Sequence, residues 1–342
     1  MITICQRRIR IHVLAGLLAV LVVNWIGRAT SAADGSAEAK VVTFYGYSDC
    51  IRLENANTRV TLCPAAGGRV LEYAWKGTNC LYLPPGAEGW TYKPGGNGGS
   101  MTAGRFDIGP EQMIPSRPQL WMGRWTGKIT GPKSARLTSV EDKPTGVQLI
   151  RDFTLNETTS QLDCKQTIKN ISRSTNEYCH WSRTFALGGG ICVIPLTKPS
   201  RFPNGYVMYD LDPGILFRPE DPNIVRRGNF LLINAAPKYP KLGMDTAAGW
   251  FAYLMKNDVM FVKRFPVDRD RVYNEVAGLT MSIWYPDRPM CELEPIGPRE
   301  RLTPGKSASF TETWWLLPHK FPKSGQQVDL KKLAAQVDRD TK

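Results

Sequence analysis

The chain has 342 residues, of which 42% are hydrophobic and 22% are charged, and its formal net charge is +13. These proportions are typical of a soluble globular protein and argue against a membrane bundle or a largely disordered chain. The charge favours acidic partners such as an anionic polysaccharide, but a solvated basic surface explains it as well. Because the basic residues are scattered and form no recognisable binding motif, we expect no nucleic-acid partner.

The N-terminal segment, residues 1–33, has the pattern of a secretory signal peptide. Three arginines precede an apolar run at 13–23, and small residues follow at 29–33. The run is shorter than the ~20 apolar residues that a membrane span needs. We therefore expect cleavage after Ala32 or Ala33, no stable membrane span afterwards, and export to the periplasm or the extracellular space. Cleavage removes four arginines and no acidic residue, which lowers the formal charge from +13 to +9.

The rest of the chain shows short β-type runs separated by Gly, Pro and Asn, with little helical periodicity. This pattern predicts an all-β fold, an antiparallel sandwich or barrel, in one domain over 34–320. A tail over 321–342 follows, in which we expect a short helix. We expect strands at 50–54, 58–64, 69–75, 80–83, 147–155, 161–170, 177–185, 190–196, 249–255, 259–265, 281–285, 290–296 and 309–317.

Two stretches rich in Gly and Pro, 84–119 and 202–228, are predicted to be long loops. Long loops on a β scaffold commonly carry function. Trp90, Trp121 and Trp125 lie in or beside the first loop. Because flat indole rings stack on the apolar faces of sugars, we expect these rings to be ligand platforms.

The mature chain would retain seven cysteines. There is no C-x-x-C pair and no His/Cys cluster with ligand spacing, so we expect no metal and no cofactor. Two alternatives remain for the thiols. In the first, a turn at 54–58 brings Cys50 beside Cys63 and the two form a disulfide. In the second, the cysteines are buried free thiols.

Polar residues inside predicted strands are the candidates for chemistry. His180 lies in an aromatic strand, which favours a buried structural histidine over a general acid or ligand. Lys263 ends an apolar run, which favours a surface position over a cation in a cleft. Glu292 and Glu294 share one face of their strand, because side chains alternate. That face borders either solvent or a polar cavity. The motifs of α/β-hydrolases, P-loop and dinucleotide-binding proteins and zinc proteases are absent from the sequence.

Several segments together resemble galactose mutarotase-like, or aldose 1-epimerase-like, β-supersandwich proteins. The resemblance is nearest to an uncharacterised bacterial family of that group, the domain of unknown function 4380, and it covers about Ile51 to Pro318. It implies a large antiparallel β-supersandwich, with long loops and few helices, that holds a sugar site on a concave face. The segments are CPAAGGRVLEYAWKGTNCLY, GRFDIGPE, CHWSRTFALGGGICVIPL, GWFAYLMKNDVMFVKRF and CELEPIGPRERLTPGKSASFTETWWLLP.

In aldose 1-epimerases a glutamate on a late strand takes the proton of the anomeric hydroxyl while a histidine protonates the ring oxygen. The resemblance implies that Glu294 is the base and His180 the acid. Alignment from Asn170 instead places Arg183 near the position of the epimerase histidine. Arg183 follows His180 by three residues, so the two side chains are expected to point to opposite faces of the strand. Glu292 is expected to raise the pKa of Glu294. The implied substrate-binding residues are Arg105, Asp107, Glu111, Trp181, Arg183, Lys263 and Glu292.

The resulting expectation is an exported protein that recognises a sugar or polysaccharide, neutral or anionic. One form of it is an aldose 1-epimerase-like isomerase that opens the sugar ring by acid–base chemistry. The alternatives are a non-catalytic carbohydrate-binding module and a polysaccharide-active hydrolase or lyase, since fold alone does not select among these functions.

Overall fold

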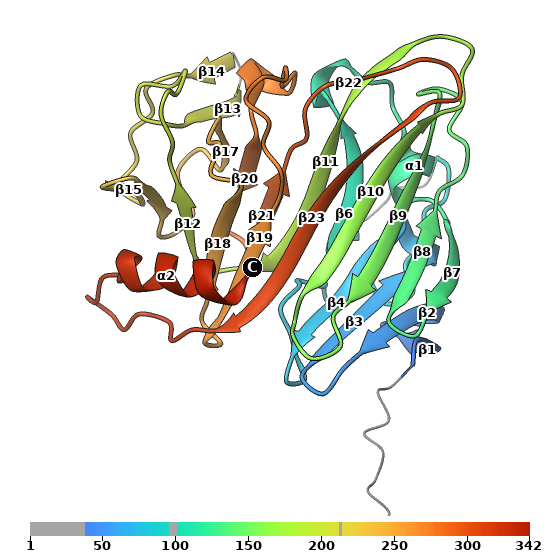
Figure 1. Ribbon diagram of the computed structural model, residues 1–342, viewed down its shortest axis with the longest axis horizontal. Helices are drawn as coiled ribbons and strands as arrows, with labels where there is room; N and C mark the ends of the chain where they lie inside the picture. The colour runs from blue at the N-terminus through green and yellow to red at the C-terminus, as the bar shows by residue number, and fades with distance from the viewer. Residues whose placement is uncertain (1–37, 96–100, 212–213) are drawn as a thin grey trace, which may run out of the picture. The chain divides into compact units, whose positions relative to one another are not determined.

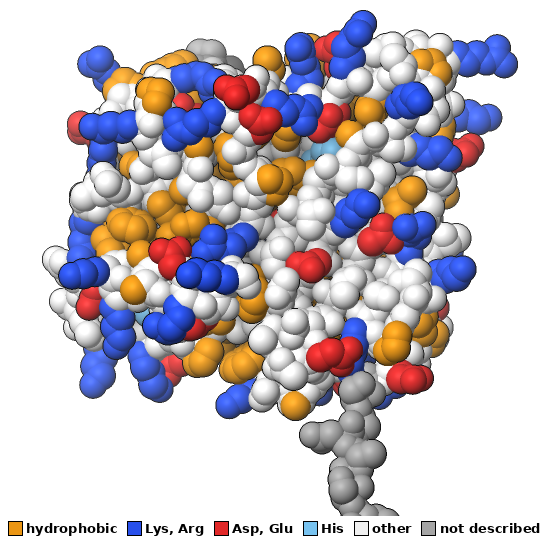
Figure 2. Space-filling view, in the orientation of Figure 1, with side chains coloured by type: hydrophobic (Ala, Val, Ile, Leu, Met, Phe, Trp, Pro, Cys, Tyr) orange, Lys and Arg blue, Asp and Glu red, His pale blue; other side chains and the backbone are white. Residues whose placement is uncertain are grey.

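The computed structural model describes residues 38–95, 101–211 and 214–342, and the predicted signal peptide lies outside these ranges. The described chain forms two large antiparallel sheets (Figure 1). This confirms the predicted all-β class. On the face seen in Figure 2, Lys and Arg side chains are dispersed and mixed with Asp and Glu.

The first sheet has thirteen strands, in the order β1-β2-β3-β4-β6-β11-β21-β20-β17-β13-β14, with β5 paired to β4 and β22 paired to β11. Its central strands come from distant parts of the chain. The strands are β1 (Lys40–Phe44), β2 (Tyr47–Glu54), β3 (Thr58–Cys63), β4 (Arg69–Trp75), β5 (Thr78–Asn79), β6 (Gly104–Gly109), β11 (Asn176–Leu187), β13 (Val207–Leu211), β14 (Gly214–Leu216), β17 (Lys241–Met244), β20 (Met281–Trp284), β21 (Met290–Pro295) and β22 (Glu300–Leu302).

The second sheet has ten strands, in the order β15-β16-β12-β18-β19-β23-β10-β9-β8-β7. They are β7 (Thr126–Gly131), β8 (Ser134–Thr138), β9 (Val147–Leu155), β10 (Leu162–Asn170), β12 (Ile191–Pro195), β15 (Ile224–Arg227), β16 (Phe230–Ile233), β18 (Trp250–Met255), β19 (Val259–Arg264) and β23 (Ser307–Pro318). The described helices are short: α1 (Pro118–Met122), α2 (Leu330–Asp340) and the 3₁₀ turns η1 (Pro64–Ala66), η2 (Glu111–Met113) and η3 (Val276–Gly278).

The main core lies between the two sheets and contains Phe106, Leu293, Phe261 and Trp314. Because side chains alternate along a strand, the neighbours of these residues in the thirteen-stranded sheet point to its other face. On β21, Leu293 enters the core, so Glu292 and Glu294 lie on the face turned away from it. We call this the distal face.

Helix α2 packs on the ten-stranded sheet and lies in front of β18 and β19 in Figure 1. Asp329, the residue before the helix, is its N-cap, because its side chain accepts a hydrogen bond of 3.0 Å from the backbone N–H of Lys332. Leu333 and Val337, one turn apart, are buried against that sheet. Within the described residues, no helix is both long enough and apolar enough to span a membrane.

The prediction of two long loops is wrong in both places. The stretch 84–119 contains β6, η2 and the start of α1, and 202–228 contains β13, β14 and β15. The sequence of β6, GRFDIG, alternates charged Arg105 and Asp107 with apolar Phe106 and Ile108, as a half-exposed strand would, but the charged side chains are buried as well. Its identity as a central strand depends on pairing with β11 over Cys179–Thr184, which the local sequence does not reveal.

The hairpin of β2 and β3 forms with Ile51 opposite Leu62, so Cys50 and Cys63 come next in register. The disulfide considered for this pair is not formed. All seven cysteines of the described chain are buried free thiols, which was the other alternative. Of the expected tryptophan platforms, Trp125 is instead buried in the core, where its indole N–H donates to the Leu120 carbonyl.

Candidate functional site

The candidate site is a group of charged and aromatic side chains on the distal face of the thirteen-stranded sheet. Four strands supply it: β6 provides Arg105 and Asp107, β11 provides Trp181 and Arg183, β21 provides Glu292 and Glu294, and β17 provides Lys241. The register brings them together. Arg183 lies opposite Arg105, and Phe185 opposite Glu292, while Ser282 of β20 lies opposite Glu294.

Glu294 is fully buried, with 0% of its surface exposed, and its carboxylate is held by three hydrogen bonds. The Lys241 ammonium donates to both oxygens at 2.6 and 2.8 Å, and the indole N–H of Trp181 donates to Oε2 at 2.7 Å. Burial raises the pKa of Glu294 to about 7; the negative charge of Glu292 adds to the increase, and Lys241 opposes it. The predicted effect of Glu292 on this pKa is therefore present, but burial is the larger cause.

Glu292 is equally buried, yet its pKa moves in the opposite direction. Burial alone would raise the pKa, but the positive charges of Arg183, Lys241 and Arg105 outweigh burial and hold it at about 2. The Arg183 Nε donates to Glu292 Oε1 at 3.0 Å, and the Arg105 guanidinium lies 3.9 Å from the same oxygen. Two carboxylates on one strand face thus have pKa values that are driven apart by different partners.

Arg183 also links the buried pair to the surface. Its Nη1 donates to Glu111 Oε1 at 2.7 Å, and Glu111 lies in η2, directly after β6. The side chains of Arg183 and Glu111 are 11% and 32% exposed, respectively. These two residues therefore form the solvent-accessible edge of the group.

Arg105 and Asp107 leave β6 on the same face but have different partners. The Arg105 guanidinium stacks on the ring of Trp121, 4.2 Å from its centroid, and burial lowers the pKa of Arg105 to about 10. Asp107 accepts two hydrogen bonds from the guanidinium of Arg117, at 2.8 and 3.1 Å. This fork geometry fixes Asp107 against Arg117, so Arg105 is the one of the two that contacts the glutamate pair.

Glu275 is a further carboxylate near the site, on the segment 265–280 that joins β19 to β20. Its Oε2 accepts a hydrogen bond of 2.9 Å from the backbone N–H of Glu111, and Oε1 has no hydrogen-bond partner among the described residues. Burial raises the pKa of Glu275 to about 7. The segment therefore contacts the turn that presents Glu111 to Arg183.

His180 does not join this group, because it lies on the core face of β11. Its imidazole stacks between the rings of Phe106 and Phe310, each 5.8 Å away, and its Nε2 lies 3.2 Å from the Ala308 carbonyl. Burial lowers its pKa to about 4. The structure thus places His180 and Arg183 on opposite faces of β11, and Arg183 is the one beside Glu292.

Lys263 is also on the core side, and the interpretation that it is a surface residue at the end of a strand is wrong. It is 0% exposed. Its ammonium forms an ion pair of 3.1 Å with Glu312 and donates to Thr184 Oγ1 at 2.8 Å and to the Leu293 carbonyl at 3.2 Å. Because the Leu293 backbone lies between them, Lys263 and Glu294 are on opposite sides of the same sheet.

The described residues include no cluster of three or more His, Cys, Asp or Glu side chains that could hold a metal ion. The chemistry available on the distal face is that of paired cations and carboxylates beside aromatic rings. The Lys241 ammonium lies 5.2 Å from the Trp181 ring centroid and 5.8 Å from that of Tyr209, so the Glu294 pair has aromatic walls.

Sequence reasoning missed Lys241 and Glu275. Strand β17 has only four residues and follows Pro237 and Pro240, so Lys241 has the sequence context of a surface loop. Glu275 follows a charged run, DRDR at 268–271, that is typical of exposed chain. The one usable signal was the short apolar run after Lys241, which could have indicated a strand.

No family model matches the chain, and no curated protein matches it. Solved structures do match. A galactose mutarotase-like protein from Lactobacillus casei ATCC 334 is 11% identical with a TM-score of 0.55, over 78% of this chain and 100% of that one. The Slr1438 protein from Synechocystis sp. PCC 6803 is 15% identical with a TM-score of 0.55, over 81% and 99%.

A third matching structure is an Escherichia coli K12 protein whose description as an aldose 1-epimerase is itself provisional. It is 11% identical with a TM-score of 0.56, over 78% of this chain and 98% of that one. Identities this low carry no argument about activity, and the likeness concerns the fold alone. The chain therefore has the galactose mutarotase-like β-supersandwich fold.

Proposed function

We propose that this protein is an exported carbohydrate-binding protein of the domain of unknown function 4380 type, and that its distal face catalyses ring opening of an aldose. The observation that carries the proposal is the pair Glu292 and Glu294. Their environments drive their pKa values to about 2 and about 7, so one carboxylate stays ionised while the other exchanges a proton near neutral pH. Such a separation is the usual mark of assigned acid–base roles.

In the proposed reaction Glu294 takes the proton of the anomeric hydroxyl. The bond between C1 and the ring oxygen then breaks, its electron pair stays on the ring oxygen, and that oxygen accepts a proton. The Lys241 ammonium, 2.6 Å from Glu294, is the protonated group that we assign as donor. Rotation about the bond between C1 and C2 and closure on the other face of the carbonyl give the second anomer, and the same groups return the protons.

The surroundings suit a sugar. Indole and phenol rings offer flat apolar surfaces for the C–H faces of a pyranose, and charged side chains bind hydroxyl groups. Trp181 and Tyr209 lie beside Lys241, and Trp121 lies beneath Arg105. Arg183 and Glu111 at the accessible edge are the residues through which we expect a sugar to enter.

A non-catalytic carbohydrate-binding module is the second candidate, and one observation favours it. The Glu294 carboxylate is fully buried, and Lys241 and Trp181 already occupy both of its oxygens. A base must give up at least one of these hydrogen bonds to contact a hydroxyl group. If that exchange does not occur, the face binds sugar through its edge residues without turnover.

The two candidates are separated by following optical rotation of freshly dissolved α-aldoses with the wild-type chain, with Glu294→Gln, and with Glu157→Gln. Glu157 is exposed, so it controls for the loss of one carboxylate. We expect Glu294→Gln to slow mutarotation by about 10²–10⁴-fold, the usual contribution of a general base, and Glu157→Gln to leave it unchanged. Sugar binding by saturation-transfer NMR should persist in both variants.

Wild-type protein that binds aldoses without accelerating mutarotation would establish the binding module instead. A Glu294→Gln variant with normal turnover would show that the base is wrongly assigned. Absence of both binding and turnover with every aldose tested would remove the carbohydrate proposal.

A further inference from the structure

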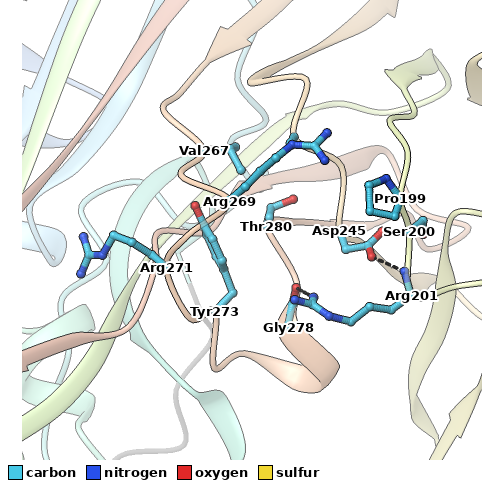
Figure 3. Close-up of a pocket in the computed structure, with 11 residues that line it drawn as sticks. Pro199, Ser200, Arg201, Asp245, Val267, Arg269, Arg271, Tyr273, Gly278 and Thr280 are labelled. Carbon is cyan, nitrogen blue, oxygen red and sulfur yellow. Dashed lines mark hydrogen bonds between the residues drawn. The ribbon is translucent and has the colours of Figure 1, made fainter.

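A cavity of about 260 Å³ is lined by residues outside the glutamate pair (Figure 3). Its walls come from the segment after β12, from the end of β17 and from the segment 265–280. Such a volume is below the ~300–1,000 Å³ of pockets for drug-sized ligands, so it suits a single small group or one sugar ring. The residues that matter are Ser200, Arg201, Asp245, Arg269, Tyr273 and Thr280.

Two guanidinium groups in this cavity have no carboxylate partner. Arg201 donates to the Gly278 carbonyl at 2.9 Å and Arg269 to the Lys198 carbonyl at 3.1 Å, and neither forms an ion pair with any described residue. Since each guanidinium has five N–H donors, most donors of both remain for a ligand. Arg271 differs, because it is paired with Glu300 at 2.8 Å and points away from the cavity in Figure 3.

Asp245 is the one acidic side chain among the described residues that line the cavity, and its carboxylate is already bound. Ser200 Oγ donates to Oδ1 at 2.7 Å, and the backbone N–H of Arg201 donates to Oδ2 at 2.6 Å. These bonds tie Asp245 to the loop that presents Arg201. With the charges of Arg201 and Arg269 set against one carboxylate, the cavity keeps an excess of positive charge.

We propose that this cavity binds an oxyanion, namely a carboxylate, sulfate or phosphate group, between the guanidinium groups of Arg201 and Arg269. Guanidinium groups hold such anions through paired, charge-assisted hydrogen bonds. In Figure 3 the Arg201 guanidinium lies beside Gly278 and the Arg269 guanidinium lies on the other side of Thr280 and Asp245, so that two different loops place one cation on each side of the cavity. The bound group would be a free inorganic anion or the acidic substituent of a sugar.

The cavity and the glutamate site share a wall. Thr280 lines the cavity, and its carbonyl accepts the backbone N–H of Ile296 at 3.0 Å, two residues beyond Glu294. Leu279, the residue before Thr280, belongs to the same buried cluster as Trp181 and Tyr209. An acidic sugar could therefore place its charged group in the cavity, although the oxyanion site itself does not depend on the proposed ring-opening activity.

The test is isothermal titration calorimetry of the purified chain at low ionic strength with sodium sulfate, sodium phosphate, sodium glucuronate and, as the neutral comparison, glucose. We expect the oxyanions to bind at this site. Arg201→Gln and Arg269→Gln should each weaken binding by about tenfold, the scale of a lost charge-assisted contact.

Arg173→Gln is the matched control, because Arg173 is exposed and lies outside the cavity. It should leave the affinity within about twofold of wild type, since only a distant charge is lost. Tighter binding of glucuronate than of the inorganic ions would identify the ligand as a sugar acid, and the reverse order would identify a free anion.

Three results would overturn the proposal: no oxyanion binds, Arg173→Gln weakens binding as much as the cavity variants do, or neither cavity variant changes the affinity. Two independent arginine variants keep the test decisive if one of them folds poorly. Binding of sulfate and phosphate is measured in the absence of sugar. A negative result for this site is therefore distinguishable from a negative result for the ring-opening proposal.

Discussion

The ion pair between Lys263 and Glu312 provides the sharpest test of how the core is built. We expect Lys263→Met to destabilise the fold strongly, because it leaves Glu312 charged and unpaired in the space between the sheets. Glu312 would retain its hydrogen bond of 2.8 Å from Gln166 and the attraction of the buried Arg151, but it would lose its ion-pair partner. Glu312→Gln should have a similar effect, since it leaves the buried ammonium without a carboxylate.

The geometry fixes the expected size of the effect. At 3.1 Å and an effective dielectric constant of about 20, the Coulomb attraction between Lys263 and Glu312 is roughly 5 kcal/mol. Removal of one partner of a buried pair typically costs about 3–5 kcal/mol, because the remaining charge is not compensated. Burial lowers the pKa of Lys263, so loss of its proton would reduce the destabilisation caused by Glu312→Gln.

The measurement is a double-mutant cycle in urea, with the free energy of unfolding determined for wild type, both single variants and Lys263→Met with Glu312→Gln. The double variant contains no buried charge at this pair, so it should be more stable than the sum of the two single effects predicts, by about 2 kcal/mol or more. If each single variant costs under ~1 kcal/mol with unchanged m-values, the pair is not buried as described, and a ligand-binding role for Lys263 regains support.

Three further predictions concern protons and thiols. Burial lowers the pKa of His180 from 6.5 to about 4, so its contribution to stability is present above pH 6.5 and is lost as the pH falls toward 4, by roughly 3 kcal/mol. Urea melts over this pH range should show a steeper loss of stability in wild type than in His180→Phe. Parallel curves for the two proteins would contradict this. Because the raised pKa of Glu294 keeps it protonated in acid, kcat/KM for aldose ring opening should rise with pH through about 7; a flat profile by polarimetry would exclude Glu294 as the base. The seven buried free thiols should resist alkylation by iodoacetamide in the native chain, and all seven should react in guanidinium without reductant. Intact mass spectrometry counts the adducts. Fewer than seven adducts in guanidinium would show that a disulfide exists.

The fold class was predictable from sequence because short β-type runs with turn residues between them recur along most of the chain. Alternation within a strand was predictable for the same reason, so Glu292 and Glu294 were assigned to one face correctly. Whether that face met solvent or a polar site was not predictable. The answer depends on β11, which pairs with β21 from a distant part of the chain and supplies Trp181 and Arg183 to that face.

The errors share one physical cause, which is that burial was judged from local sequence. Lys263 follows an apolar run and has the pattern of a strand end, yet β23 lies beside it and supplies Glu312. Strand β6 contains charged residues and glycine, so it was assigned to a loop, although its charges are buried against partners from β21 and the segment after β6. A polar residue is tolerated in such positions only when a partner arrives from elsewhere in the fold.

The segment 265–280 has a consequence for how proteins of this architecture diverge. It contributes Glu275 beside the glutamate pair, Arg269 to the proposed oxyanion cavity, and Leu279 to the buried cluster that contains Trp181. Exchange of this one connection would alter the surroundings of the glutamate pair and the lining of the cavity while leaving both sheets in place. Ligand preference in such a scaffold can therefore evolve by replacement of a single segment, independently of the strands that carry Glu292 and Glu294.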